Sequence, residues 1–143
     1  MTESHFRSII KGITWRAVGT LDTIVISFFL TGYINTALKI GATEIITKIL
    51  LYYLHERVWL FFLEDKDQTP VVSFIKSVSW RTLGTIDTML LGWFYSGNAL
   101  TGLKIGFIEV ATKIILYYLH ERAWHRVPIG SVRKWFGVRN TEE

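Results

Sequence analysis

The chain has 143 residues, of which 50% are hydrophobic and 15% aromatic, with a formal net charge of +4 and no cysteine. The length fits one domain, and the apolar share is higher than a soluble domain of this size usually needs. The lack of cysteine excludes disulfides, thiolate metal sites and thiol redox chemistry. Lysine and arginine form no dense basic run beside a nucleic-acid-binding motif, so we expect no nucleic-acid partner.

A tandem repeat divides the chain. A gap-free alignment places residues 8–59 over residues 73–124, and more than half of the aligned residues are identical. The stretch between the copies, "LFFLEDKDQTPVV", carries an acidic cluster and Pro70, which is typical of a linker. We therefore expect five segments: an N-terminus at 1–7, repeat 1 at 8–59, a linker at 60–72, repeat 2 at 73–124 and a basic tail at 125–143.

Each repeat predicts a hairpin of two membrane-spanning helices. A charge-free window in each copy, at 23–38 and 88–103, contains a turn-like segment, "TGYINT" or "SGNALT". Reading outward from these turns predicts four helices of about 23 residues, long enough to cross a hydrocarbon core of about 30 Å, near 11–33, 36–58, 76–98 and 101–123. A soluble four-helix bundle is the alternative, because the second and fourth of these helices carry several charges.

Charges and aromatic residues predict the orientation. Most lysines and arginines lie on the side of the termini and the linker, whereas the far side has only Lys39 and Lys104 near its helix starts. By the positive-inside rule, both ends are expected in the cytoplasm, in a multi-pass protein of the inner (cytoplasmic) membrane. Tryptophans and tyrosines near the same boundary are typical of an aromatic belt. Because each repeat crosses an even number of times, we expect a pseudo-two-fold axis along the membrane normal.

Charged residues inside the predicted helices form the candidate functional site. Glu44 and Lys48 are four residues apart, in the better order for an ion pair within one helix. Counting back from the turn puts Asp22 level with both, so these three residues could meet inside the membrane. Repeat 2 copies this set, and the candidate network or pathway consists of Arg16, Asp22, Glu44, Lys48, Arg81, Asp87, Glu109 and Lys113.

This network allows two interpretations. Charges inside a membrane are costly and usually functional, so the network could line a pathway for an ion or polar solute. Two positive and two negative charges per hairpin would equally suit a sealed network that holds the helices in register. Small residues on the same face, Gly41, Gly102 and Gly106, predict close helix packing. Four helices leave little room for a pathway within one chain, so we expect a homo-oligomer.

The phrase "LLYYLHERVW" recurs as "ILYYLHERAW", where each repeat leaves the predicted membrane. Paired histidines could ligate haem or a metal, but the strings lack the second His of HExxH, and we predict neither metal nor cofactor. A haem- or quinone-binding protein is a less favoured alternative. No catalytic triad, phosphate loop or carboxylate cleft is visible, so we expect no enzyme. The interfacial motif consists of His55, Glu56, Arg57, His120, Glu121 and Arg122.

The paired signatures "TWRAVGTLDT" with "LLYYLHERVW", and "SWRTLGTIDT" with "ILYYLHERAW", resemble the small prokaryotic membrane proteins of domain of unknown function family 2061. The resemblance covers residues 8–125 and implies a membrane protein with one or two hairpin units, but no activity or catalytic residue. The fold that we predict is an all-α membrane protein with four transmembrane helices. The expected function is an oligomeric channel or transporter for a small ion or polar solute, with an inorganic anion among the candidates. A non-transporting assembly or scaffold protein is the alternative.

Overall fold

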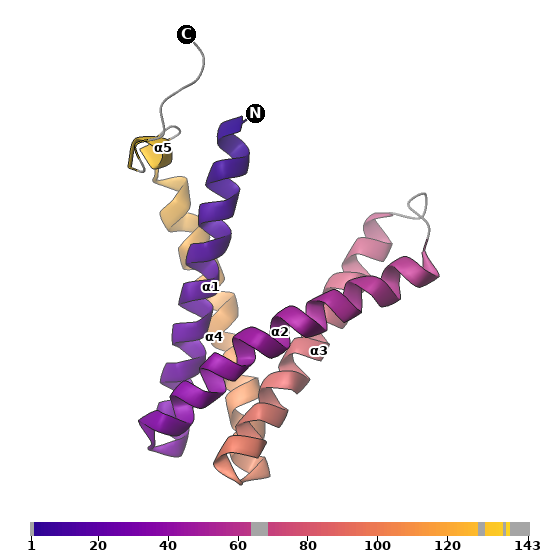
Figure 1. The fold of residues 1–143 in the computed structure, drawn as a ribbon, viewed down its shortest axis with the longest axis vertical. Coiled ribbons are helices and arrows are strands. Elements are labelled where there is room, and N and C mark those ends of the chain that lie inside the picture. The colour runs from indigo at the N-terminus through magenta and orange to yellow at the C-terminus, as the bar shows by residue number, and fades with distance from the viewer. Residues whose placement is uncertain (1, 64–68, 129–130, 136, 138–143) are drawn as a thin grey trace.

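The computed structural model describes residues 2–63, 69–128, 131–135 and 137. It contains four long helices and a short fifth one: α1 (Thr2–Thr31), α2 (Ile34–Phe62), α3 (Pro70–Ser96), α4 (Ala99–His125) and α5 (Ser131–Trp135) (Figure 1). The prediction of an all-α fold with four helices in two pairs is confirmed. Part of the predicted linker and much of the predicted tail fall outside the described residues.

The long helices extend further than the predicted spans. α2 continues to Phe62 and α3 begins at Pro70, so both helices reach into the predicted linker. The span prediction counted about 23 residues outward from each turn, the length that crosses a membrane, whereas a helix can continue beyond that length. α3 starts with its Thr69 hydroxyl accepting a hydrogen bond from the Val72 amide and with proline at the first helical position, both of which favour a helix start.

Tight turns reverse the chain between α1 and α2 and between α3 and α4. Gly32 and Gly97 have φ angles of 76° and 72°, in the left-handed region that glycine adopts without strain. After the second turn, the Asn98 side chain accepts hydrogen bonds from the first amides of α4, whereas Tyr33 offers α2 no such cap. The predicted turn segments therefore lie where the two hairpins reverse.

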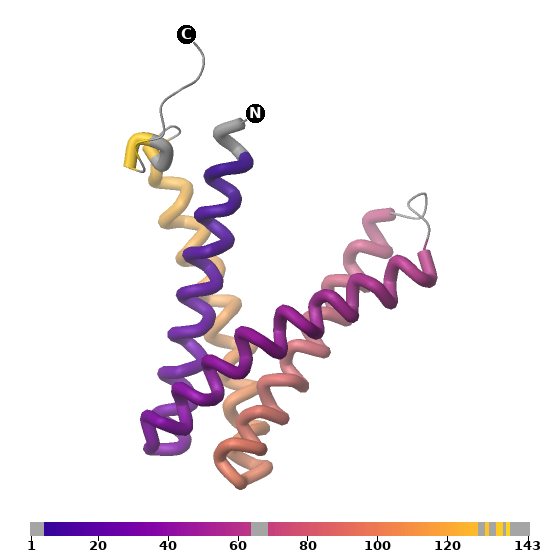
Figure 2. The backbone as a smooth tube through the Cα atoms, in the orientation of Figure 1, coloured from indigo at the N-terminus to yellow at the C-terminus, as the bar shows by residue number. Residues whose placement is uncertain are grey.

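The helices of each hairpin contact each other near the turn and then diverge (Figure 1). Away from the turns, each helix lies along a helix of the other repeat. We call α1 with α4 the first arm and α2 with α3 the second arm. The two arms meet at the end that carries both turns and are separate at the end that carries the chain termini and the linker (Figure 2). By the alignment of the two repeats, α1 is equivalent to α3 and α2 to α4.

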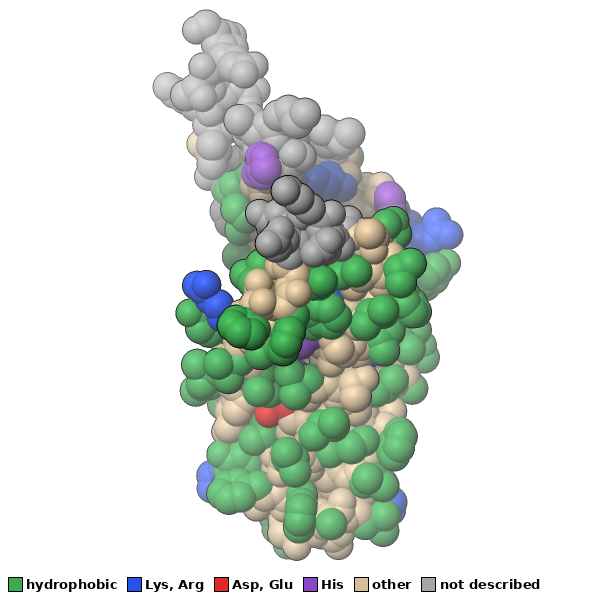
Figure 3. Space-filling view, turned by 90° about the vertical axis from the view of Figure 1, so that its right-hand side faces the viewer, with side chains coloured by type: hydrophobic (Ala, Val, Ile, Leu, Met, Phe, Trp, Pro, Cys, Tyr) green, Lys and Arg blue, Asp and Glu red, His purple; other side chains and the backbone are tan. Residues whose placement is uncertain are grey.

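Polar residues are buried and large apolar residues are exposed, which is the reverse of a soluble bundle. Ile26, Ile40 and Ile105 form a small core. Among the described residues, buried polar residues are as many as buried hydrophobic ones and are Thr23, Ser27, Glu44, Thr88 and Glu109. Hydrophobic side chains cover much of the visible face in Figure 3. Such extensive exposed apolar surface is rare on monomeric soluble proteins and is expected where lipid replaces water.

One helical segment has both the length and the hydropathy usual for a membrane span. Among the described residues, His5–Thr31 meets this standard, with a mean hydropathy of 1.4 over its best window. α2 and α4 carry more charge in their central turns, among them Glu44 and Lys48 in α2 and their copies in α4. These charges lower the hydropathy of helices that are otherwise long enough to cross a bilayer.

Candidate functional site

Lys48 connects the two repeats where the four helices cross. Its ammonium group lies 3.0 Å from the Glu44 carboxylate, one turn earlier in α2, and 3.2 Å from the Asp87 carboxylate in α3. It also donates hydrogen bonds to the Gly84 carbonyl oxygen, at 2.7 Å, and to the Thr88 hydroxyl, at 2.9 Å. The lysine side chain is only 15% exposed, so the protein replaces most of the water that would otherwise solvate its charge.

Lys113 repeats this arrangement in the first arm. It forms an ion pair with Glu109 in its own helix and lies 3.9 Å from the Asp22 carboxylate in α1. Its ammonium group also donates to the Thr23 hydroxyl, at 3.2 Å, and to the Gly19 carbonyl oxygen, at 3.4 Å. Each lysine therefore pairs with the aspartate of the other repeat.

This pairing differs from the one that the depth count predicts. The count brings Asp22 to Lys48 within one hairpin, whereas the structure brings Asp22 to Lys113 and Lys48 to Asp87. The reason is that α1 diverges from α2 and lies along α4 at this depth. The Glu44–Lys48 pair within α2 is present as the sequence predicts.

Glu44 and Glu109 are the buried glutamates of the network, only 6% and 5% exposed. The Thr23 hydroxyl of repeat 1 lies 3.3 Å from Glu109 Oε1 in repeat 2. The Thr88 hydroxyl of repeat 2 donates to Glu44 Oε1 in repeat 1 at 2.9 Å. The crossing point is therefore built on two threonine–glutamate contacts between repeats.

The three glycines of the predicted packing face lie at tight contacts inside the hairpins. A Cβ added to Gly41 would lie 2.5 Å from Ile24 Cγ1 in α1. One added to Gly102 would lie 2.6 Å from the Trp93 backbone nitrogen in α3, and one on Gly106 would overlap the Met89 side chain. Glycine therefore lets the two helices of each hairpin approach closely near the turn.

The recurring "LHER" phrase lies at the open end of each arm. In the second arm, Lys76 donates to the Glu56 carboxylate at 2.8 Å, and the Ser79 hydroxyl lies 2.8 Å from His55 Nε2. The Trp59 indole N–H also donates to His55 Nε2, at 3.1 Å. These residues hold α2 against α3, so the motif connects the two repeats.

The first arm contains the equivalent contacts. Lys11 lies 2.6 Å from the Glu121 carboxylate, and the Thr14 hydroxyl lies 2.8 Å from His120 Nε2. Trp124 takes the place of Trp59 and donates to the same nitrogen at 3.1 Å. The sequence interpretation missed these partners of the histidine motif. One signal in the sequence could have found them: both repeats have a lysine, Lys11 or Lys76, at the same distance from the turn.

Arg57 and Arg122 are the remaining members of the interfacial motif. They contact neither the central network of charges nor the histidine contacts at the open ends of the arms. Each guanidinium lies over a tyrosine one turn earlier in its own helix, 5.1 Å from the Tyr53 ring centre and 5.4 Å from that of Tyr118. A cation over an aromatic face is a favourable contact that leaves the charge near solvent. This geometry suits arginines at the end of a membrane helix.

The histidines are poorly placed to hold a shared cofactor. His55 belongs to the second arm and His120 to the first, and the arms diverge toward this end. An indole N–H can only donate, so the lone pair of each Nε2 that accepts from tryptophan is already used, whereas Nδ1 of both histidines is buried without a hydrogen-bond partner among the described residues. Among the described residues, no group of three or more histidine, aspartate or glutamate side chains could hold a metal ion.

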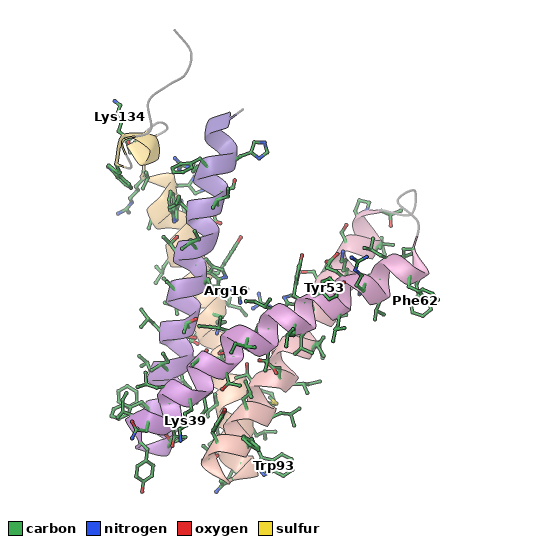
Figure 4. All side chains as sticks on the ribbon, viewed as in Figure 1. Arg16, Lys39, Tyr53, Phe62, Trp93 and Lys134 are labelled. Atoms are coloured by element: carbon green, nitrogen blue, oxygen red, sulfur yellow. The ribbon has the colours of Figure 1, made fainter. Side chains whose placement is uncertain are left out.

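Arg16 and Arg81 lie outside the central network, although the sequence interpretation included them. Both are exposed, and among the described residues neither guanidinium has an ion pair or a hydrogen bond. Figure 4 shows Arg16 on the side of α1 turned toward α2, in the region where the arms diverge. Arg81 is the equivalent residue of α3. The network therefore contains aspartate, glutamate and lysine, and the arginines keep all their donors available.

Two helical hairpins with an apolar exterior and buried polar contacts define a helical membrane protein. The chain belongs to the family described as "Predicted membrane protein (DUF2061)", which matches residues 9–60 and, separately, 74–125. The family resemblance of the two repeats is thereby confirmed. No curated protein and no solved structure matches the chain.

Proposed function

We propose that this protein is a membrane transporter or channel for a small inorganic anion, and that Arg16 and Arg81 bind the anion. The observation that carries the proposal is the unpaired state of these two arginines. The neighbouring carboxylates of Asp22 and Asp87 are both taken by lysines. A charge at this depth of a membrane helix is costly and usually functional.

The chemistry of arginine favours an oxyanion. A guanidinium presents several N–H donors in one plane, which matches two oxygens of a carboxylate, sulfate or phosphate group. Arg16 and Arg81 are related by the pseudo-two-fold axis and are exposed. Each could therefore contact an anion that enters between the arms from the open end.

The membrane topology is part of the proposal. The long helices have 27 to 30 residues, and at 1.5 Å per residue they measure roughly 40 to 45 Å. Even when tilted they can cross a hydrocarbon core of about 30 Å. We place the termini and the linker in the cytoplasm of a cell with an inner membrane, so the arms open toward the cytoplasm and the turns face outward.

A homo-oligomer belongs to the same proposal. The helices pack closely near the turns around Ile26, Ile40 and Ile105, which closes the outer end of a single chain. An anion could pass this end only if the hairpins rearrange or if a second copy completes the pathway. The wide apolar exterior offers surface for contacts between copies in the membrane.

Anion flux into proteoliposomes tests the function. The parent should carry chloride, sulfate or phosphate faster than empty liposomes, and Arg16→Gln with Arg81→Gln should reduce the flux about tenfold or more, since each charged hydrogen bond contributes about 1.5 to 3 kcal/mol. Lys11→Gln with Lys76→Gln is the matched control, because it removes the same charge at the arm ends. Equal flux in both variants, or flux of cations only, would contradict the assignment.

A non-transporting scaffold is the second candidate. The observation that favours it is the sealed pairing around Lys48 and Lys113, which joins the repeats with few free polar atoms. In this case the parent protein would pass none of the tested anions above empty liposomes. The two arginines would then serve to bind an acidic partner, and the same double variant would weaken that complex without altering any flux.

A further inference from the structure

The buried network carries more negative than positive charge. Two ammonium groups, on Lys48 and Lys113, face four carboxylates, so two negative charges are in excess if every group is ionised. Arg16 and Arg81 would balance this charge, but they do not contact the network. The groups that surround the centre come from all four long helices: Asp22 from α1, Glu44 and Lys48 from α2, Asp87 from α3, and Glu109 and Lys113 from α4.

One oxygen of this network lacks a donor. Glu109 Oε1 accepts hydrogen bonds from Lys113 and Thr23, but Glu109 Oε2 is buried and has no hydrogen-bond partner among the described residues. The Ser27 hydroxyl, one turn beyond Thr23 in α1, is also buried without a partner. A bare carboxylate oxygen in such surroundings is costly, because neither water nor a donor compensates its charge.

We propose that Glu109 is a proton-binding site and carries one proton on Oε2. A proton on this oxygen removes one excess charge and turns an unsatisfied acceptor into a donor. Where carboxylates outnumber the cations of one buried network, one of them commonly retains a proton, since all of them cannot ionise at low cost.

A proton fits the site better than a metal ion does. Among the described residues, the acidic side chains do not form a group of three able to coordinate a metal. The lysines already occupy the positions between aspartate and glutamate that a cation would need. A proton needs one oxygen with a free lone pair, and Glu109 Oε2 provides it.

The proton stabilises Glu109 beside Thr23, at the crossing point of the two repeats. Its loss would leave an ionised carboxylate oxygen in the interior without a donor, so the folded protein should lose stability as the pH rises. Protonation instead stabilises the crossing, and this effect is fully present at low pH. The site is thus a pH-dependent contact between repeats, whether or not the protein carries anions.

Infrared difference spectroscopy on the purified full-length protein tests the proposal. We expect a carbonyl band of a buried carboxylic acid that shifts in heavy water and disappears in Glu109→Gln. The matched control is Glu121→Gln, which changes a partly exposed glutamate of the same helix and should leave the band intact. Absence of the band at every pH, or its persistence in Glu109→Gln, would overturn the proposal.

Thermal unfolding gives a second, independent readout. Glutamine has the shape of a protonated glutamate, so Glu109→Gln should unfold at nearly the same temperature as the parent at neutral pH and lose the parent's decline at alkaline pH. If Glu109 is instead ionised, the substitution breaks its pair with Lys113, and the melting temperature falls sharply at all pH values. A Glu109→Gln protein that fails to fold, while Glu121→Gln folds, would count as this second outcome.

Discussion

Replacement of Lys48 by methionine removes one charge from the crossing point and keeps most of the side-chain volume. The lysine contacts Glu44 at 3.0 Å and Asp87 at 3.2 Å, and both carboxylates lie in the interior. It also satisfies the Gly84 carbonyl oxygen. Removal of one partner from a buried pair costs about 3 to 5 kcal/mol, because the remaining charges stay buried without compensation. We expect a loss of stability in this range.

Lys76→Met is the matched control. Lys76 also pairs with a glutamate of the other repeat, at 2.8 Å from Glu56, but the two side chains are 26% and 28% exposed at the open end of the second arm. Ion pairs near solvent contribute about 0 to 1 kcal/mol. The two substitutions remove the same group from the same kind of contact. The difference between their losses of stability therefore measures the effect of burial at the crossing point.

Unfolding in mixed detergent, followed by the loss of helical circular dichroism, provides the free energy of unfolding for both variants. Combining Lys48→Met with Asp87→Asn should recover about 1 to 3 kcal/mol relative to the sum of the single changes, as expected for residues in contact. Combining it with Asp22→Asn should recover less. Equal losses of stability for Lys48→Met and Lys76→Met, or stronger coupling of Lys48 to Asp22 than to Asp87, would refute the pairing of each lysine with the aspartate of the other repeat.

Two further predictions concern packing and topology. Gly102→Ala should destabilise the protein by about 1 to 3 kcal/mol, since the added Cβ meets the α3 backbone. Gly12 has open space around it, so Gly12→Ala should be neutral or stabilise the protein by about 0.5 to 1 kcal/mol. Thermal unfolding of both variants checks these predictions, and equal effects would contradict the tight contact at Gly102. Asn35→Cys and Leu100→Cys, at equivalent exposed positions beside the turns, should each react with a membrane-impermeant thiol reagent in intact cells. Labelling only after lysis would contradict the proposed orientation.

The repeat, the helices and the turns follow from the sequence because each depends on neighbours along the chain. Periodicity, absence of charge and glycine identify a helical hairpin without knowledge of its partner. The Glu44–Lys48 pair is predictable for the same reason, since a spacing of four places both groups on one helix face. These are local properties, and the structure agrees with them.

The pairing of each lysine with the aspartate of the other repeat was not predictable, because the two repeats are nearly equivalent. Lys48 and Lys113 stand at the same depth, so a depth count cannot tell which of them meets Asp22. The choice depends on the angle at which α1 crosses α2, and this angle results from packing around Gly41 and Ile24 rather than from any spacing in the sequence. Arg16 was assigned to the network for the same reason: its depth was estimated, but the divergence of the arms was not.

Identical residues of the two repeats make the charged and histidine contacts between them. Each lysine, histidine and tryptophan in these contacts has an identical counterpart in the other copy, whereas the apolar exterior holds identical residues, such as Phe29 and Phe94, as well as different ones, such as Phe28 and Trp93. The pairs that match are Lys11 with Lys76, Asp22 with Asp87, Thr23 with Thr88, Glu44 with Glu109, Lys48 with Lys113, His55 with His120, and Trp59 with Trp124. Because each ion pair between the repeats joins a lysine of one copy to a carboxylate of the other, a change in one of these residues disturbs a single arm.

The two hairpins are nevertheless unequal near their turns, and this inequality bears on how the crossing point could open. Gly92 lets the backbone of α4 approach, since a Cβ there would lie 2.9 Å from the Gly102 Cα, and α3 contacts α4 more extensively than α1 contacts α2. The equivalent residue in repeat 1 is Ser27, whose buried hydroxyl has no partner among the described residues. The first hairpin thus has the looser contact and an unsatisfied polar group. Any separation of the two arms should therefore begin between α1 and α2, where less packing is lost and a buried hydroxyl gains access to water.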